Sequence, residues 1–311
     1  MADVKVSNRQ AICNVLMELA ERDRHIVVLT SDSMGSASLA PFVKNFPEQH
    51  VEVGIAEQNI VGVAAGLASM GKKPIVASPA SFLSMRAADQ IKVDVAYSHM
   101  PVLLYGISGG LSYGALGMTH HSLQDIALMS AIPGIDVILP ADRFESQAAV
   151  RELMKNPRPA YLRIGRNPVK DVYESEQDCA YEPSKATIVR QGDDACIIAT
   201  GEMVYPAMQA SVELAKEGIQ VRVLSMHTVK PMDVAAVLTA AETGFVVTME
   251  EHSIYGGLGS TVCRILSKTP VAVHVIAVPD EPVIAGKSAQ VFEHYGMTAD
   301  HVMQVIRDRL K

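Results

Sequence analysis

Short apolar runs alternate with longer helix-like stretches along the whole chain. In the first half the apolar runs fall at residues 25–30, 74–77, 101–106, 136–140 and 161–164. A helix is predicted between the last two runs, from Asp142 to about Met154. Apolar runs without polar alternation are typical of strands covered on both faces, as in a parallel sheet. The order of strands and helices therefore predicts an α/β fold.

The same alternation returns in the second half, after a polar segment. Apolar runs at residues 195–200, 220–225 and 244–249 predict strands, and a helix is predicted from Glu202 to Glu217. The preceding segment contains prolines and an acidic cluster, which is typical of a connection that crosses the surface. We therefore expect two α/β domains with mainly parallel sheets, at residues 1–166 and 186–311, joined by a linker at 167–185.

Glu57 stands at the head of the least charged helical stretch of the chain. Residues 58–71 contain no charged side chain and are rich in glycine and alanine. A helix that is apolar on most sides is expected to be buried. A carboxylate in that environment must be paired, protonated or used in chemistry, so Glu57 is a candidate functional residue. The alternative is a carboxylate that the helix dipole favours in a first turn.

Composition and charge narrow the kinds of partner. The 311 residues are 49% hydrophobic and 20% charged, which is enough apolar material for sizeable cores. A net charge of −7 without a lysine or arginine cluster argues against nucleic acid or an anionic membrane as the main partner. No apolar stretch reaches the ~18 residues of a membrane span. No signal peptide opens the sequence, and the four cysteines lack metal-binding spacing, so we expect a cytoplasmic protein.

Three motifs in the second half follow one another as ATGEMV, VLSMHTVKPMD and VVTMEEHSIYGGLGS. In the first half, Gly54 stands three residues before Glu57, and a Thr-His-His sequence at 119–121 follows a glycine-rich loop. Together these motifs resemble the thiamine diphosphate enzymes of the transketolase family. The resemblance covers the whole chain and implies a pyrimidine-binding domain followed by the family's C-terminal domain. It matches only the C-terminal two-thirds of a full transketolase.

The resemblance implies cofactor-binding roles for Glu57 and Phe82. In the family, the glutamate at the place of Glu57 hydrogen-bonds N1′ of the cofactor's aminopyrimidine ring and so helps to form the carbanion at C2 of the thiazolium ring. An aromatic platform for the same ring comes from the segment that matches residues 81–90, where Phe82 is the aromatic residue. Family members often have further aromatic side chains where Met85 and Ala88 stand, which implies thinner stacking here. Without the resemblance, Phe82 is equally well explained as a core residue.

Substrate-binding roles are implied for four further residues. The family's histidine at the place of His120 reaches the substrate hydroxyls and the oxyanion near C2, so His120 is also a candidate catalytic residue. Arg166 matches a phosphate-contacting arginine, and Arg9 matches another near the N-terminus. Ser108 stands about where many members have a phosphate-contacting histidine. Spacing alone leaves other interpretations open, because adjacent histidines in a loop are typical of a polar turn and an arginine in a linker is ordinarily solvated.

Two positions near His120 depart from the family pattern. Leu116 stands where an aspartate that binds a sugar hydroxyl is expected, and His121 replaces a glutamine. The role of His121 stays open. A pocket with cationic ends and less hydroxyl recognition predicts substrates whose hydroxyl pattern differs from that of common pentose and hexose phosphates.

The diphosphate half of the cofactor site is expected on another polypeptide. The family's Mg²⁺-diphosphate motif, Gly-Asp-Gly followed by Asn, does not occur among the 56 residues before Glu57. We predict no metal ligands on this chain. The resemblance therefore implies a partner subunit that binds Mg²⁺ and the diphosphate of thiamine diphosphate, an α2β2 assembly, and a cofactor site between the subunits.

These expectations favour the β-type subunit of a split transketolase, which transfers a two-carbon ketol group between sugar or sugar-like substrates. Within enzymes, the alternative is a 1-deoxyxylulose-5-phosphate synthase-like subunit or a 2-oxoacid dehydrogenase β-like subunit. A non-catalytic scaffold subunit that keeps the fold is a third possibility. Glu57 with His120 favours the enzyme, whereas Leu116 and Ala88 slightly favour the scaffold.

Overall fold

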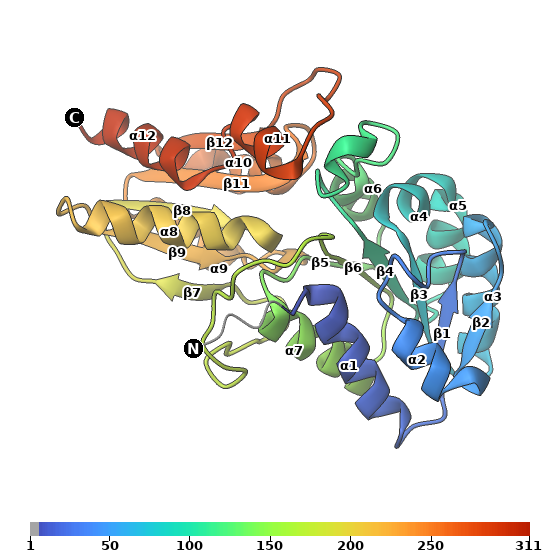
Figure 1. Cartoon of the computed structure of the whole chain (residues 1–311). Coiled ribbons are helices and arrows are strands. Elements are labelled where there is room, and N and C mark those ends of the chain that lie inside the picture. Colours follow the sequence, from blue (N-terminus) through green and yellow to red (C-terminus); the bar gives the residue numbers. More distant parts are fainter. Residues whose placement is uncertain (1–5) are drawn as a thin grey trace.

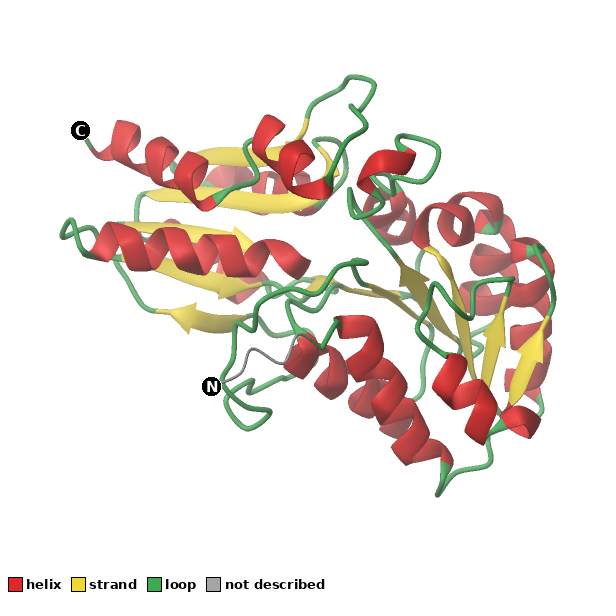
Figure 2. Cartoon of the chain, viewed as in Figure 1, coloured by secondary structure: helices red, strands yellow, loops and turns green. Residues whose placement is uncertain are grey.

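The computed structural model describes residues 6–311, which form two α/β units packed side by side (Figure 1). Each unit is a sheet of mainly parallel strands with helices on both faces (Figure 2). The predicted fold class is confirmed. No helix within the described range is long and apolar enough to cross a membrane.

The first unit is built on a seven-stranded sheet with the order β10-β5-β6-β4-β3-β1-β2. Its strands are β1 (Ile26–Thr30), β2 (His50–Glu52), β3 (Lys73–Pro79), β4 (Leu103–Ile107), β5 (Asp136–Ile138), β6 (Ala160–Arg163) and β10 (Thr228–Lys230). Neighbouring strands are parallel except β10, which runs antiparallel to β5. Strands β1 and β4 are buried along their whole length, as expected for apolar runs between two helical layers.

Helices cover both faces of this sheet. One face packs against α1 (Asn8–Ala20), α2 (Ala40–Asn45) and α7 (Arg143–Lys155). The other packs against α3 (Glu57–Ser69), α4 (Ala80–Arg86), α6 (Asp125–Ala131) and the π-helix η2 (Ile91–Tyr97). Short helical segments complete the unit: α5 (Ala88–Gln90), η1 (Pro47–Gln49) and η3 (Gly114–Leu116). Helix α7 begins where the sequence predicts it, because the Asp142 carboxylate accepts the N–H groups of Phe144 and Glu145 at 3.0 Å each.

The second unit has a five-stranded sheet with the order β12-β11-β8-β9-β7. Its strands are β7 (Thr187–Arg190), β8 (Ala195–Ala199), β9 (Val221–Ser225), β11 (Phe245–Ser253) and β12 (Ala272–Val278), of which β7 is antiparallel to β9. One face carries α8 (Val204–Ala215), α11 (Ser288–His294) and α12 (Ala299–Leu310). The other carries α9 (Val234–Ala241) and α10 (Leu258–Ile265), with the turns η4 (Gly201–Met203) and η5 (Leu266–Lys268) between elements.

Two segments tie the units together. Strand β10 follows β9 in the sequence, yet it pairs with β5 of the first sheet. The segment predicted as a linker contains no helix or strand. Asp142 accepts the backbone N–H of Tyr173 in this segment at 3.1 Å, and the Tyr173 hydroxyl donates to the buried Glu145 at 2.8 Å. The connecting segment is therefore anchored on the start of α7.

Candidate active site

Glu57 lies in the first turn of α3, and it is 5% exposed. No side chain caps this helix, so its free N–H groups carry the positive end of the helix dipole, which favours a carboxylate there. Gly54, with a φ of 73°, makes the turn that leads the chain from β2 toward the helix. Both carboxylate oxygens of Glu57 accept from Nη1 of Arg86, at 3.1 and 3.0 Å. The buried carboxylate is therefore paired with a cation.

Arg86 connects Glu57 to Phe82. Arg86 and Phe82 lie on α4 four positions apart, and so on the same face of the helix. The guanidinium carbon of Arg86 is 4.1 Å from the centroid of the Phe82 ring, in a cation–π contact. The Arg86 side chain is 48% exposed, so this contact opens to the surface. Sequence reasoning missed Arg86, although its helical spacing from Phe82 was a signal that could have found it.

His120 lies between two aromatic rings. Its ring centroid is 5.2 Å from that of Phe82 and 5.3 Å from that of Tyr113, both in edge-on geometry. The hydroxyl of Thr119 is 2.9 Å from His120 Nδ1 and fixes the orientation of the ring. Tyr113 was not predicted, and its place in the glycine-rich loop carried no local signal for this contact.

His121 turns away from these rings. It is buried, and its Nε2 lies 3.1 Å from the carbonyl oxygen of Gly114, which can only accept a hydrogen bond. Burial lowers the pKa of the His121 imidazole, so the neutral ring holds the loop in place. Leu116, in η3 of the same loop, is exposed in the single chain. The two adjacent histidines thus face different environments.

The predicted cationic residues lie beyond Tyr113. The guanidinium carbon of Arg166 is 5.1 Å from the centroid of the Tyr113 ring. Arg9 donates through Nη2 to the Arg166 carbonyl at 2.5 Å and through Nη1 to the Ser36 carbonyl. Ser108, directly after β4, is fully buried with a φ of 57°, and its hydroxyl has no partner among residues 6–311. Ser108 therefore does not join the surface contacts of the two arginines.

Most of the predicted site residues thus form one continuous row. We call this series the contact row: Glu57, Arg86, Phe82, His120, Tyr113, Arg166 and Arg9. Its members come from α1, α3, α4, the loop after β4 and the segment after β6. A carboxylate stands at one end, aromatic rings and an imidazole in the middle, and two cations at the other end. Such a row can bind a planar donor, a polar carbon centre and an anion in that order.

The loop that carries His120 is held by the second unit. Glu251 on β11 accepts the N–H of Leu111 at 3.0 Å, and its neighbour His252 accepts the N–H of Ala127 through Nε2 at 3.3 Å. Glu250 has a different task, because its carboxylate accepts N–H groups of Leu258 and Gly259 at the start of α10, at 2.7 and 2.8 Å. The glycine-rich run at 256–259 is therefore a structural feature whose anion is an internal carboxylate.

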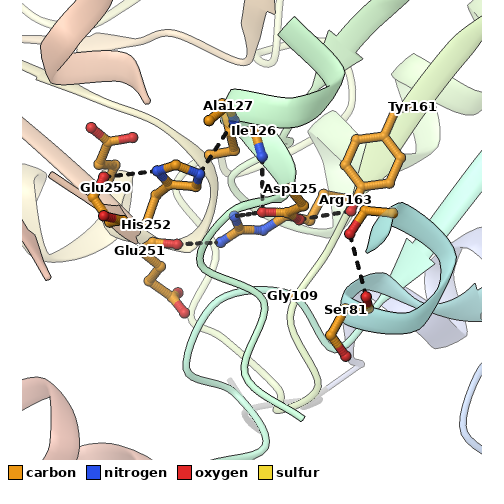
Figure 3. Close-up of polar contacts among 12 residues, drawn as sticks. Ser81, Gly109, Asp125, Ile126, Ala127, Tyr161, Arg163, Glu250, Glu251 and His252 are labelled. Carbon is orange, nitrogen blue, oxygen red and sulfur yellow. Dashed lines mark hydrogen bonds and ion pairs between the residues drawn. The ribbon is translucent and has the colours of Figure 1, made fainter. Parts of the chain in front are cut away.

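Arg163 crosses the interface between the units (Figure 3). Its Nη1 pairs with Asp125 at 3.1 Å, and its Nη2 donates to the Glu251 carbonyl at 2.8 Å. The Tyr161 hydroxyl donates to the second oxygen of Asp125 at 2.7 Å. Burial alone lowers the pKa of Arg163, but Asp125 and Glu251 outweigh it and raise the pKa above its usual value. The guanidinium therefore stays charged inside the protein and holds α6 and β11 together.

Comparison with known proteins gives two matching family models. Residues 4–171 match the pyrimidine binding domain of transketolase, and residues 184–302 match its C-terminal domain. One of the two subunits of the apulose-4-phosphate transketolase of Phocaeicola vulgatus is 46% identical over 312 residues, which span all of this chain and all of that protein. The 6-deoxy-6-sulfo-D-fructose transketolase subunit of Clostridium sp. strain MSTE9 is 38% identical over 302 residues, 96% of this chain and 93% of the relative.

Solved structures agree with these matches. A split gene transketolase, described as an inactive β4 tetramer, superposes with a TM-score of 0.89 at 36% identity and covers 98% of both chains. A transketolase mutant from Pichia stipitis, with a TM-score of 0.82 and 20% identity, shares the fold and is covered over 46% of its length. The chain belongs to the transketolase family, in which it is the C-terminal subunit of a split transketolase.

Proposed function

We propose that this subunit completes the pyrimidine end of a thiamine diphosphate site and transfers a two-carbon ketol group between anionic sugars or sugar-like substrates. The position of Arg86 carries the proposal, because this planar N–H donor lies on the Phe82 ring and pairs with the Glu57 carboxylate. An aminopyrimidine ring needs the same two contacts, an acceptor at its edge and an aromatic group at its face. The residues therefore fit that part of the cofactor.

Glu57 would act on the proton of the pyrimidine nitrogen. When bound, thiamine diphosphate supplies the C2 carbanion that ketol transfer needs. Glu57 would hold a proton at N1′, a role that suits a carboxyl group shielded from water. Arg86 would first have to leave Glu57, because the guanidinium and the pyrimidine compete for the same oxygens. Phe82 would then support the ring that replaces Arg86.

The rest of the contact row would bind the substrate. His120, next to Phe82, would donate to the hydroxyl and oxyanion beside the reacting carbon. Arg166 and Arg9 would meet an anionic terminus through charge-assisted hydrogen bonds. The names of two similar proteins contain a phosphate-ended and a sulfonate-ended ketose, which supports an anionic substrate. Apulose 4-phosphate is therefore the first donor to test.

A partner subunit would supply Mg²⁺ and the contacts of the diphosphate. Apolar side chains next to contact-row residues in the sequence are exposed in the single chain, namely Ile55, Met85, Leu116 and Met118. Exposed apolar groups around a site are typical of a surface that another chain covers. The similar split transketolase is described as inactive as a β4 tetramer, which supports the need for a second type of subunit. We propose an α2β2 enzyme.

A cytoplasmic location fits the cysteines. All four, at positions 13, 179, 196 and 263, are free thiols in the structure, and three of them are buried. Free thiols are typical of proteins in a reducing compartment. We therefore place the enzyme in the cytoplasm.

The test is the reconstituted enzyme, with the partner subunit, thiamine diphosphate and Mg²⁺. The donors are apulose 4-phosphate, 6-deoxy-6-sulfofructose, xylulose 5-phosphate and pyruvate, each with a common aldose phosphate acceptor. We expect kcat/KM to favour the first two over xylulose 5-phosphate. Leu116 cannot bond a hydroxyl, and an unpaired buried polar group costs roughly tenfold to a hundredfold in selectivity. Leu116→Asp should narrow the difference.

The other outcomes point to the alternatives. Pyruvate as the best donor would indicate a 1-deoxyxylulose-5-phosphate synthase-like or 2-oxoacid dehydrogenase-like reaction. The 37% identity with the 1-deoxy-D-xylulose-5-phosphate synthase of Heliobacterium modesticaldum, of which the chain spans 46%, makes this arm worth including. If a Glu57→Gln complex turns over as fast as the wild type, the chain is a scaffold.

A further inference from the structure

Glu202 reaches from the second unit toward the segment that carries Arg166. It lies in η4, directly after Gly201, whose N–H donates to the Leu139 carbonyl of the first unit at 3.0 Å. This turn is thus fixed at the interface by a backbone hydrogen bond. The Oε1 atom of Glu202 is buried and has no hydrogen-bond partner within residues 6–311. A buried carboxyl oxygen is costly, so the position calls for an explanation.

The carboxyl group of Glu202 packs directly on Gly165. A Cβ added to Gly165 would lie 2.2 Å from Oε2 and 2.3 Å from Cδ of Glu202, so no other residue fits there. The backbone N–H of Gly165 acts on the carboxylate as a hydrogen-bond donor. The adjoining cavity, also lined by Arg163 and Glu251, measures about 10 Å³, which leaves room for one water molecule at most.

Contacts on both sides of Gly165 complete the support of this segment. The Ile164 carbonyl accepts the N–H of Gly109 at 2.8 Å, and the Arg166 carbonyl accepts from Arg9 at 2.5 Å. Glu202 holds Gly165 between these two points. A shift of Gly165 would therefore move Arg166 relative to Tyr113 and Arg9 at once.

We propose that Glu202 is a positioning residue for the two arginines that meet the anionic end of the substrate. The inference rests on the proposed function, in which Arg166 and Arg9 bind that anion. Glu202 touches neither the substrate nor the cofactor, and it acts through Gly165. Selectivity for anionic substrates thus depends on a contact between the two domains of the chain.

The test compares Glu202→Ala and Glu202→Gln in the reconstituted enzyme with xylulose 5-phosphate and unphosphorylated xylulose as donors. Loss of one oriented hydrogen bond in Glu202→Ala should raise KM for the phosphorylated donor by about tenfold, while kcat and KM for xylulose stay within about twofold. Glu202→Gln keeps an acceptor for the Gly165 N–H and should restore most of the difference. Glu213→Ala, an exposed position on α8, is the matched control.

Gly165→Ala provides a second route to the same contact. Its added Cβ would displace the segment and should give the same selective rise in KM. In the double variant Gly165→Ala/Glu202→Ala the clash is absent, so the effects should not add. Inorganic phosphate, used as a competitive inhibitor, should lose affinity by the same factor in each single variant, which gives a readout independent of turnover.

Two results would overturn the inference. Equal changes in KM or kcat for both donors would reduce Glu202 to a residue that stabilises the interface, as would additive effects in the double variant. A wild-type enzyme without preference for the phosphorylated donor would give a different signature, because it would remove the proposed anion site itself. The two failures are therefore distinguishable.

Discussion

At Glu57 a carboxylate, a helix N-terminus and one guanidinium meet where little water reaches. The pairing with Arg86 explains how a buried charge is tolerated at the head of an apolar helix. It also means that the carboxylate is held ready for a planar donor rather than for a spherical cation. The chemistry at this residue therefore depends on an exchange of partners.

Glu57→Gln tests that chemistry, because it keeps the size of the side chain and removes the ionisable group. Hydrogen–deuterium exchange at C2 of the cofactor in the reconstituted enzyme should slow by about 10²–10⁴-fold, the usual range for lost acid–base help. NMR measures the exchange, and circular dichroism should show an unchanged fold. Glu213→Gln is the control. Exchange at the wild-type rate would reduce Glu57 to a helix-terminal charge.

Arg86→Met tests the exchange of partners. In the isolated chain Glu57 loses its cation, and the free energy of unfolding should fall by about 1 kcal/mol, a small value because Arg86 is half exposed. In the reconstituted enzyme the Kd for thiamine diphosphate should fall, since the guanidinium no longer competes for Glu57. Calorimetry measures both quantities, with the exposed Arg22→Met as control. Weaker cofactor binding would instead make Arg86 a ligand of the cofactor.

At this scale the sequence predicted the ends of the contact row better than its joints. Glu57 stands out by the absence of other charges around it, and His120 and Arg166 follow from motif positions. Arg86 and Tyr113 act only through contacts with residues distant in sequence, and no local pattern encodes those contacts. Glu202 is the extreme case, since its contact joins two domains.

Among the elements, β11 has the most varied tasks. Glu250, Glu251 and His252 follow one another on this strand and serve the start of α10, the His120 loop and α6 in turn. Successive side chains of a strand point to opposite faces, so one short run can serve neighbours on both sides. The strand is thus the element that couples the two units at the site.

Burial of carboxyl groups at this interface predicts a pH dependence. Burial and the neighbouring Glu251 raise the pKa of Glu202 above its ordinary value, so the folded state holds a proton that the unfolded state has lost. Stability from this source is present at low pH and is lost as pH rises through the window above about 4.3. Urea denaturation from about pH 5 to about pH 8 should show Glu202→Gln gaining stability relative to wild type, by up to roughly 1 kcal/mol per pH unit. Parallel curves would mean that Glu202 is charged throughout.

The strands show how far local patterns reach. Apolar runs predicted β1, β3, β4, β6, β8 and β9 to within two residues, because a fully buried strand must be apolar on both faces. Strands β2, β7 and β10 were missed. Each is short and only partly apolar, and its pairing partner, rather than its own sequence, makes it a strand.

For the whole molecule, the exposed apolar groups around the site predict that the chain alone is incomplete. Titration calorimetry with thiamine diphosphate and Mg²⁺ should show weaker than micromolar binding to the isolated chain, and binding should appear only with the partner subunit. Light scattering should show self-association of the isolated chain, since its apolar surface lacks the partner. Micromolar cofactor binding by the chain alone would contradict the division of the site between subunits.

Strand β10 makes the two units inseparable in a practical sense. It leaves the second unit to cover β5, which would otherwise be an open edge of the first sheet. A polypeptide cut in the connecting segment would release a first half with an unpaired, aggregation-prone margin and a second half with a dangling strand. Within this family a gene can therefore be divided upstream of the pyrimidine-binding domain, whereas a break at residues 167–185 would yield two fragments that need each other to stay in solution.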